Sequence, residues 1–396
     1  MRPPYQIVDA DAHVNPVPTF WEDYLPSHLR ELAPKVEHAD DADYIVFEGR
    51  RKKMNLLGAQ AGRAGKDFKI EGRLSDTRKG GWMPGERLAD MDRDGMDAAV
   101  LFGGGPLGTG HDELYIASFS AYNRWLADFC SYAPDRFCGV AYVPMRDVDQ
   151  TVAMMKEAAS LGFTAVNIPA FPQSPEPLNP QLAGIAQIAA LTGDPMGERR
   201  FDQPEFDPVW AAAVDLGLTL TIHLGARTAR FTDPDKFLAD MPMTKVAMAE
   251  PIAIMIYGAV FQRFPDLKFA TIESGVGWFA WFANYMDATW KKQRFWTKSP
   301  LTEPPSFFMD RNVYGSFIDD VVGIHNRRLP GGKNIMWSSD YPHSETTYPE
   351  SHRVIERLFA DVPEGDKAEI LGGIAKRLFR VGDGRAQPVE AVAAAE

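Results

Sequence analysis

The stretch Tyr5-Gln-Ile-Val-Asp-Ala-Asp-Ala-His-Val-Asn15 decides how the rest of the chain is interpreted. Residues 6–8 are typical of a short buried strand, and Asp9, Asp11 and His13 follow directly. Alternate residues of a strand share one face, so Asp11 and His13 can point together beyond its carboxyl end. A carboxylate oxygen and an imidazole nitrogen that converge there form half of a divalent metal site. The alternative is that the aspartates cap a turn and His13 lies on the surface.

The composition indicates a large globular protein. A chain of 396 residues that is 45% hydrophobic can form one large α/β barrel or two domains. Its net charge is −12, without a long Lys/Arg block, so we expect no nucleic-acid partner. No apolar run reaches the roughly 18 residues of a membrane span, and the start lacks a signal-peptide pattern. We therefore expect a cytoplasmic protein without a membrane partner, and the only two cysteines, Cys130 and Cys138, do not suggest a disulfide framework.

Strand and helix patterns alternate about eight times along the chain. The expected strands are residues 6–8, 97–102, 137–143, 165–168, 218–223, 267–272, 313–318 and 334–340. Helical patterns separate them, including one near 182–190, and residues 245–264 are expected to be helical. Eight such units favour an α/β fold of the closed (β/α)₈ TIM-type barrel, with an open doubly wound sheet as the alternative. We expect a single barrel domain over residues 1–384 and a flexible tail over 385–396.

Residues 36–86 form an insertion after the first strand. They contain a candidate hairpin strand at 44–47, and the remainder is rich in Gly, Lys and Arg, as expected for a mobile basic loop. One interpretation is a lid that brings Arg73 or Arg78 to an anionic substrate. The other interpretation is a solvated surface insertion without a role in binding.

Further residues of metal-ligand type fall at expected strand ends, where barrel enzymes build their sites. His223 ends the fifth strand, Glu273 follows the sixth, and Asp340 ends the eighth. Each has a structural explanation of its own, as a core histidine, a helix cap or a turn cap before Pro342. Taken together in one barrel, two histidines and carboxylates suit one divalent ion such as Zn²⁺ or Mn²⁺.

Four motifs give the chain a family resemblance: Asp9-Ala-Asp11-Ala-His13, Thr221-Ile-His223, Thr271-Ile-Glu273-Ser-Gly and Ser339-Asp340-Tyr-Pro-His343. They resemble motifs of the amidohydrolase superfamily, within the group that includes aminocarboxymuconate-semialdehyde decarboxylase and γ-resorcylate decarboxylase. The resemblance extends over residues 7–379. It implies a (β/α)₈ barrel, one divalent metal ion and a homodimer. By position it implies the metal ligands Asp11, His13, His223 and Asp340.

Two positions depart from the pattern of that family. The first motif is commonly His-x-His, whereas Asp11 stands here at its first position, as an acidic residue does in the resorcylate decarboxylase branch. The end of the sixth strand usually carries a histidine that acts as acid and base, and here it carries Glu273. Glu273 could be the base itself or a further metal ligand, in which case His343 takes over the proton transfer.

The resemblance implies a metal-dependent enzyme that acts on a small carboxylic acid. We expect non-oxidative decarboxylation of an aromatic or unsaturated acid, with Glu273 or His343 as the proton donor. Trp82 and Trp278 are candidate walls of the substrate pocket, although core packing would also explain them. The alternative is hydrolysis of an amide, ester or carbon–carbon bond by a metal-activated water, with Asp340 or Glu273 accepting its proton. A metal-binding sensor without catalysis is a third interpretation.

Overall fold

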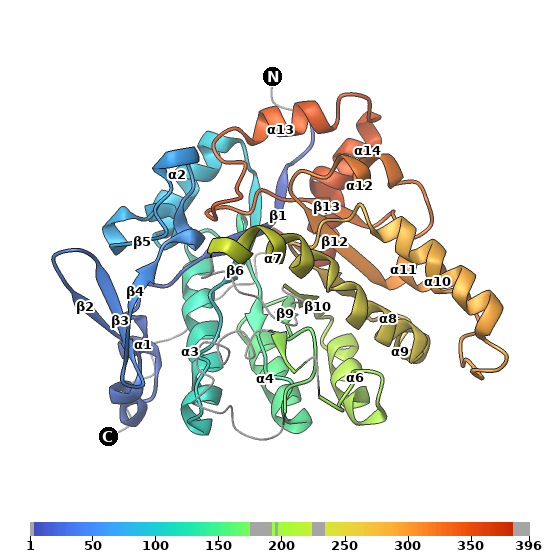
Figure 1. Cartoon of the computed structure of the whole chain (residues 1–396), viewed down its shortest axis with the longest axis horizontal. Coiled ribbons are helices and arrows are strands. Elements are labelled where there is room, and N and C mark those ends of the chain that lie inside the picture. Colours follow the sequence, from blue (N-terminus) through green and yellow to red (C-terminus); the bar gives the residue numbers. More distant parts are fainter. Residues whose placement is uncertain (1–3, 175–191, 195–196, 224–233, 383–396) are drawn as a thin grey trace.

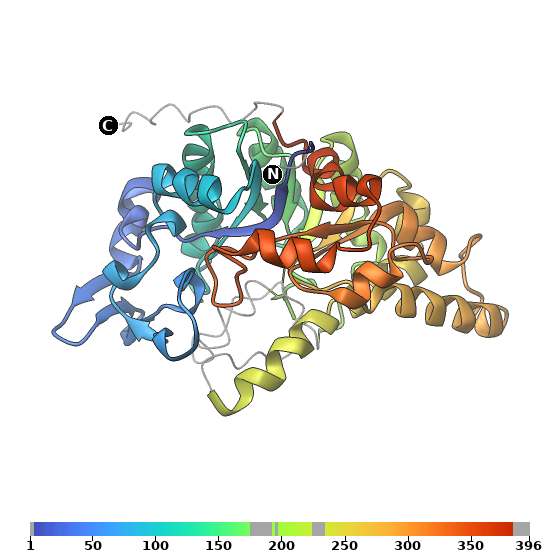
Figure 2. The same ribbon diagram turned by 90° about the horizontal axis from the view of Figure 1, so that it is seen from above.

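The computed structural model describes residues 4–174, 192–194, 197–223 and 234–382. Within these residues, parallel strands form a central layer that helices surround (Figures 1 and 2). The helix expected near residues 182–190 lies outside the described residues. Among the described residues, no helix is both long and apolar enough to span a bilayer.

The central strands all run parallel to their neighbours and fall into two sheets, β1–β6–β7 and β8–β9–β10–β11–β12–β13. Their bounds are β1 Val8–Val14, β6 Ala98–Gly103, β7 Phe137–Gly139, β8 Ala141–Tyr142, β9 Ala165–Asn167, β10 Thr219–Ile222, β11 Phe269–Thr271, β12 Val313–Phe317 and β13 Ile335–Trp337. Only Val140 separates β7 from β8, so these two strands occupy one position of the layer. The eight expected strand positions are therefore all present.

The first and last strands approach each other at their carboxyl ends. The amide of Asp340, just after β13, donates to the carbonyl oxygen of Asp11 on β1 at 3.0 Å. The described residues form no strand ladder between β13 and β1 themselves. The predicted α/β fold of parallel strands and helices is confirmed, and this contact places the two strand ends side by side.

Helices follow most strands and bury one face against them. Their bounds are α1 Phe20–Tyr24, α2 Pro84–Asp94, α3 Asp112–Ser131, α4 Val148–Ser160, α6 Asp207–Asp215, α10 Phe279–Gln293, α11 Pro305–Asn312, α12 Val321–Asn326, α13 Ser351–Leu358, α14 Glu364–Ala368 and α15 Ile374–Phe379. Local sequence sets their ends. Pro84 begins α2 and Gly95 ends it with a φ of +81°, which an L side chain rarely adopts. Asp147 caps α4 by accepting from the amide of Gln150 at 2.8 Å.

Residues 245–264 were expected to be helical, and most of them are, although in separate helices. The chain forms three helices there: α7 Pro234–Val246, α8 Ala249–Tyr257 and α9 Val260–Arg263. Pro251 lies in the first turn of α8, where backbone N–H groups have no partner within the helix, so the N–H that proline lacks is not needed. Ala259, between α8 and α9, has a φ of +57°, which interrupts helical geometry. These two backbone features explain the breaks.

The insertion after β1 forms a small antiparallel sheet instead of a mostly irregular loop. Its strands are β2 Lys35–His38, β3 Asp43–Phe47, β4 Arg50–Asn55 and β5 Glu71–Gly72, paired in that order. The candidate hairpin strand at 44–47 is confirmed as part of β3. The loop expected over residues 50–55 is wrong, because these residues pair with β3 as β4. Lys and Arg dominate β4, and their side chains point to solvent from an exposed strand.

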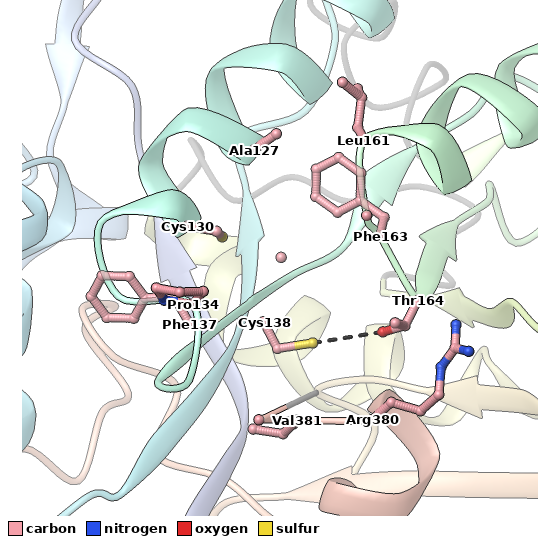
Figure 3. A pocket seen from close by; sticks show the side chains of 13 residues that line it. Ala127, Cys130, Pro134, Phe137, Cys138, Leu161, Phe163, Thr164, Arg380 and Val381 are labelled. Carbon is pink, nitrogen blue, oxygen red and sulfur yellow. Dashed lines mark hydrogen bonds between the residues drawn. The ribbon is translucent and has the colours of Figure 1, made fainter. Parts of the chain in front are cut away.

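Within the described residues, Cys130 and Cys138 form no disulfide bond. Figure 3 shows them beside a small pocket between α3, β7 and the segment that follows α15. Burial raises the pKa of Cys130, and Cys138 Sγ lies 3.8 Å from Thr164 Oγ1. The pocket holds a volume of about 30 Å³, which is room for one or two waters but not for an organic acid.

Candidate metal centre

The structure brings the predicted metal-type residues together at the carboxyl ends of the parallel strands. Asp11 and His13 lie on β1, while His223, Glu273 and Asp340 follow β10, β11 and β13. All five side chains are buried. We call these five residues the central cluster.

Strand geometry explains how β1 supplies two members of the central cluster. β1 is longer than expected and carries the whole Asp-Ala-Asp-Ala-His run within the strand. Its pairing with β6 shifts register between Asp9 and Ala12. Asp9 does not join the cluster, because its carboxylate accepts from the amide of Ser339 at 2.8 Å and from the Ser339 hydroxyl. Asp9 therefore fastens the end of β1 to the segment that carries Asp340.

Two members of the central cluster have an unusual backbone. Glu273 and Asp340 both have a φ of +57°, in the left-handed region that residues with side chains seldom occupy. The amide of Glu273 donates to Ser316 Oγ at 2.8 Å, which helps to hold this conformation. Strained residues of this kind concentrate at functional sites, where the surrounding structure holds them in place.

Nitrogen and oxygen atoms of the central cluster converge on one small region. His13 Nε2 lies 3.3 Å from Asp11 Oδ1 and 3.1 Å from Asp340 Oδ1. His223 Nε2 lies 3.1 Å from Glu273 Oε2 and 3.6 Å from Asp11 Oδ1. The ligand atoms of Asp11, His13, His223 and Glu273 all lie within 4.8 Å of one another, a separation at which one ion can contact them all.

The hydrogen bonding of the central cluster fits a divalent cation. Among the described residues, both carboxylate oxygens of Asp11 and Asp340, and Nε2 of His13, are buried without a hydrogen-bond partner. Unpaired buried carboxylates are costly, whereas a divalent cation satisfies carboxylate and imidazole lone pairs together. The residues present therefore have the chemistry of a metal site.

Electrostatics in the central cluster point the same way. Burial, together with the charges of Asp340 and Glu273, outweighs the neighbouring His223 and raises the pKa of Asp11 to about 7. In the absence of a cation, repulsion in one buried space thus disfavours the simultaneous ionisation of all three carboxylates. A bound divalent ion would remove this repulsion.

Glu273 is held on both sides of its carboxylate. Lys245 Nζ, from α7, donates to Oε1, and Oε2 faces His223 Nε2. Burial alone would raise the pKa of Glu273, but Lys245 and then His223 outweigh it and hold this pKa well below its usual range. Glu273 is therefore ionised. Lys245 could not be predicted from the sequence, because it lies in a helix with no motif that distinguishes it from a surface lysine.

His343 lies beside the central cluster and faces open space. Its ring stacks on that of His13 with a centroid separation of 3.7 Å, and its Nδ1 lies 3.0 Å from Asp340 Oδ1. Burial alone would lower the pKa of His343, but the charge of Asp340 and contact with it outweigh this and raise the pKa to about 9. The exposed fraction of its side chain is 26%, against 6% for His13, so His343 can exchange protons with the space outside.

Two cavities meet at Glu273 and His343. The inner cavity, about 160 Å³, is lined by the polar side chains of Asn15, Tyr142 and Asn167 together with His13 and His223. The outer cavity, about 260 Å³, lies between the insertion and α7, and Leu57, Gly58, Phe237, Met241 and Thr244 are among its lining residues. Together they offer room for a small acid next to the central cluster.

The residues predicted to bind substrate lie away from these cavities. The Arg73 guanidinium donates to the carbonyl oxygens of Ala39 and Asp40. Arg78 pairs with Asp90 and donates to the Tyr348 hydroxyl, at the junction of the insertion, α2 and the segment after β13.

The two predicted tryptophans are likewise bonded to their own surroundings. Trp82 donates to Thr77 Oγ1 at 3.1 Å, and Trp278 donates to the carbonyl oxygen of Ser274 at 3.1 Å. None of these four residues lines either cavity, and their part in substrate binding stays a prediction.

A parallel α/β fold with buried Asp, Glu and His at the carboxyl ends of its strands is typical of metal-dependent barrel enzymes. Comparison with known families defines the class further. The chain belongs to the amidohydrolase family, whose model matches residues 8–381. This confirms the family predicted from the four sequence motifs.

Similar proteins support the fold. The chain is 23% identical over 310 residues to 2-amino-3-carboxymuconate-6-semialdehyde decarboxylase of Dictyostelium discoideum, covering 74% of this chain and 76% of that protein. An amidohydrolase structure from Mycobacterium avium subsp. paratuberculosis K-10 matches with a TM-score of 0.70 at 20% identity, over 95% of this chain and 100% of the other. The 5-carboxyvanillate decarboxylase of Novosphingobium aromaticivorans, complexed with manganese and 4-hydroxy-3-methoxy-5-nitrobenzoic acid, matches with a TM-score of 0.63 at 19% identity, over 95% and 96% of the two chains.

Proposed function

We propose that this enzyme releases carbon dioxide, without oxidation, from a small aromatic or unsaturated carboxylic acid. The observation that carries the proposal is the position of His343, which touches the central cluster and faces both cavities. The names of two similar proteins, the carboxymuconate-semialdehyde and carboxyvanillate decarboxylases, support the same chemistry.

Asp11, His13, His223 and Asp340 are the proposed ligands of one divalent ion, either Mn²⁺ or Zn²⁺, and Glu273 lies close enough to join them. When bound, the ion supplies positive charge that binds and orients the carboxylate of the substrate. The oxygen-rich set of side chains favours Mn²⁺ over Zn²⁺, and the manganese complex of the similar decarboxylase supports this preference.

His343 is the proposed proton donor. As the bond between the carboxylate and the ring or alkene carbon breaks, its electron pair stays on that carbon, and His343 protonates it. Glu273 is less suited to this step, because Lys245 and His223 hold it as a carboxylate. The outer cavity gives His343 a path to recover its proton from water.

The two cavities favour a substrate whose body is uncharged. Asn15, Tyr142 and Asn167 offer neutral hydrogen-bonding groups in the inner cavity, which suits a hydroxyl or methoxyl substituent. Leu57, Phe237 and other apolar side chains line the outer cavity, which suits the face of a ring. Arg73, Arg78, Trp82 and Trp278 stay further proposed contacts. We also propose that the enzyme is a homodimer in the cytoplasm.

One observation favours hydrolysis as a second candidate. Glu273 is an ionised carboxylate beside the proposed metal ligands, and such a group can accept a proton from a water molecule. In that reaction the substrate would be an amide, an ester or a carbon–carbon bond next to a carbonyl group.

An isotope experiment separates the two reactions. The Mn²⁺-loaded enzyme is incubated with hydroxybenzoic, methoxyhydroxybenzoic and muconate-type acids in D₂O, and with amides and esters in H₂¹⁸O. Decarboxylation gives carbon dioxide and a product with one deuterium at the carbon that lost it. Products that carry ¹⁸O, without carbon dioxide release from any acid of the panel, would instead establish hydrolysis.

A further inference from the structure

Lys245 lies in the last turn of α7, the helix that crosses in front of the central strands in Figure 1. The same helix contributes Phe237, Met241 and Thr244 to the wall of the outer cavity. Through its contact with Glu273, Lys245 therefore links α7, which lines the outer cavity, to the residue that follows β11.

The ammonium group of Lys245 bridges two carboxylates. Nζ donates to Glu273 Oε1 and also to Glu345 Oε2, the latter at 3.1 Å. The exposed fraction of the Lys245 side chain is 19%, and that of Glu273 is 9%, so water screens this pair little. Among the described residues, no other lysine or arginine nitrogen lies within 4.0 Å of a carboxylate of the central cluster.

We propose that Lys245 is a positioning residue, which holds the Glu273 carboxylate beside His223 at the metal centre. Glu273 shares a buried space with Asp11 and Asp340, and repulsion from these two carboxylates would drive its side chain outward. The attraction of Lys245 opposes this movement. Its role in turnover rests on the proposed function, whereas its hold on Glu273 does not.

The hold on Glu273 is tested by thermal unfolding of Lys245→Met, Glu273→Gln and the double variant, each as the full chain with metal removed. We expect Lys245→Met to lower the Tm by several degrees, because it leaves the Glu273 carboxylate buried without its cation. In the Glu273→Gln background the same change should lower the Tm much less, because no charge is left to compensate. An equal drop in both backgrounds would overturn the proposal.

Lys333→Met is the control. The side chain of Lys333 is exposed and pairs with Asp310 at 2.7 Å, away from the central cluster, so its removal should change the Tm little. Lys245→Arg keeps the positive charge and should restore most of the Tm. If the Tm of Lys245→Arg is no higher than that of Lys245→Met, the result also contradicts a hold that depends on charge.

The role in turnover is tested on the Mn²⁺-loaded enzyme with an acid that the wild type decarboxylates. We expect Lys245→Met to lower kcat by about tenfold or more with KM changed by less than about twofold, and Lys245→Arg to recover part of kcat. An unchanged kcat in Lys245→Met would refute the role in turnover. If the wild type decarboxylates no acid, the proposed function fails, while the unfolding experiment still decides whether Lys245 holds Glu273.

Discussion

The carboxylates of Asp11, Glu273 and Asp340 are each buried, and each has an oxygen within 4.0 Å of the His13 ring nitrogen Nε2. Burying charges of one sign close together costs free energy. Proteins do so mainly where a cation binds or where a reaction needs the charged groups. Only Glu273 has a lysine partner among the described residues. Among the described residues, Asp11 and Asp340 thus have no lysine or arginine partner, whereas Lys245 neutralises Glu273 in part.

Replacement of His343 tests its proposed part in proton transfer. We expect His343→Gln to lower kcat by about a hundredfold or more, because a neutral amide cannot donate a proton to carbon. Metal content, measured by elemental analysis after gel filtration, should match that of the wild type. Loss of metal together with activity would instead make His343 a ligand, and a kcat near the wild-type value would remove it from the mechanism.

At the scale of elements, the insertion after β1 forms part of the site. The backbone of residues 57–61 bonds to the segment after β13: Ser344 N–H donates to the Leu57 carbonyl at 3.1 Å, and Ala61 N–H to that of Pro342 at 2.9 Å. Asn15 also donates to the Gly58 carbonyl at 2.9 Å. The insertion therefore forms a fixed wall of the outer cavity, instead of the mobile loop that its Gly and Lys/Arg content suggests.

Gly58 tests this wall. A Cβ at Gly58 would lie 3.5 Å from the His343 ring and 3.6 Å from Asn15, which is ordinary contact, so we expect Gly58→Ala to be nearly neutral. Gly58→Leu adds three more carbons that have to occupy the cavity, and it should raise KM by about tenfold or more with little change in Tm. Steady-state kinetics and thermal unfolding measure both. A KM for Gly58→Leu equal to that of Gly58→Ala would show that substrate binds elsewhere.

A second link between elements makes stability depend on pH. Asp90 on α2 accepts from Arg78, Tyr341 and Tyr348, and these contacts outweigh burial and hold the pKa of Asp90 below its usual value. A lowered pKa contributes stability above the unfolded pKa of about 3.9, and this contribution is lost as the pH falls through the folded value.

We therefore expect Asp90→Asn to be less stable than the wild type at pH 7, with a difference that shrinks below about pH 4. Urea unfolding at a series of pH values measures this. Glu86→Gln, on the exposed side of the same helix, is the control and should follow the wild type. A difference between wild type and Asp90→Asn that stays constant from pH 7 to pH 3 contradicts this account.

The sequence predicted the elements that periodicity and motifs define. All eight strand positions were found, because each is a short apolar run that ends in polar or turn residues, and the ligand-type residues at their ends met as expected. Lys245 and β4 were missed for a physical reason. A lysine in an amphipathic helix and a basic exposed strand look like ordinary surface, and only tertiary contacts show what they touch.

For the whole molecule, the metal ion is expected to act as a structural cross-link. It would join residues near both ends of the chain and remove the repulsion among buried carboxylates. We expect Mn²⁺ at a hundred times its Kd to stabilise the metal-free protein by about 2.7 kcal/mol.

Scanning calorimetry with and without Mn²⁺ measures this effect, and a chelator should reverse it. His223→Ala should bind little metal and show little stabilisation, whereas His325→Ala, on exposed α12, should behave as the wild type. Equal metal content in His223→Ala and wild type would mean that His223 is not a ligand.

The bond between Asp9 and Ser339 joins residues that are 330 positions apart in the chain. During synthesis the ribosome releases Asp11 and His13 long before Asp340 and His343. The two early side chains therefore emerge without the later residues that complete the proposed metal centre. A product that terminates before Ser339 lacks this bond and also Asp340 and His343, so we expect it to bind the metal ion poorly.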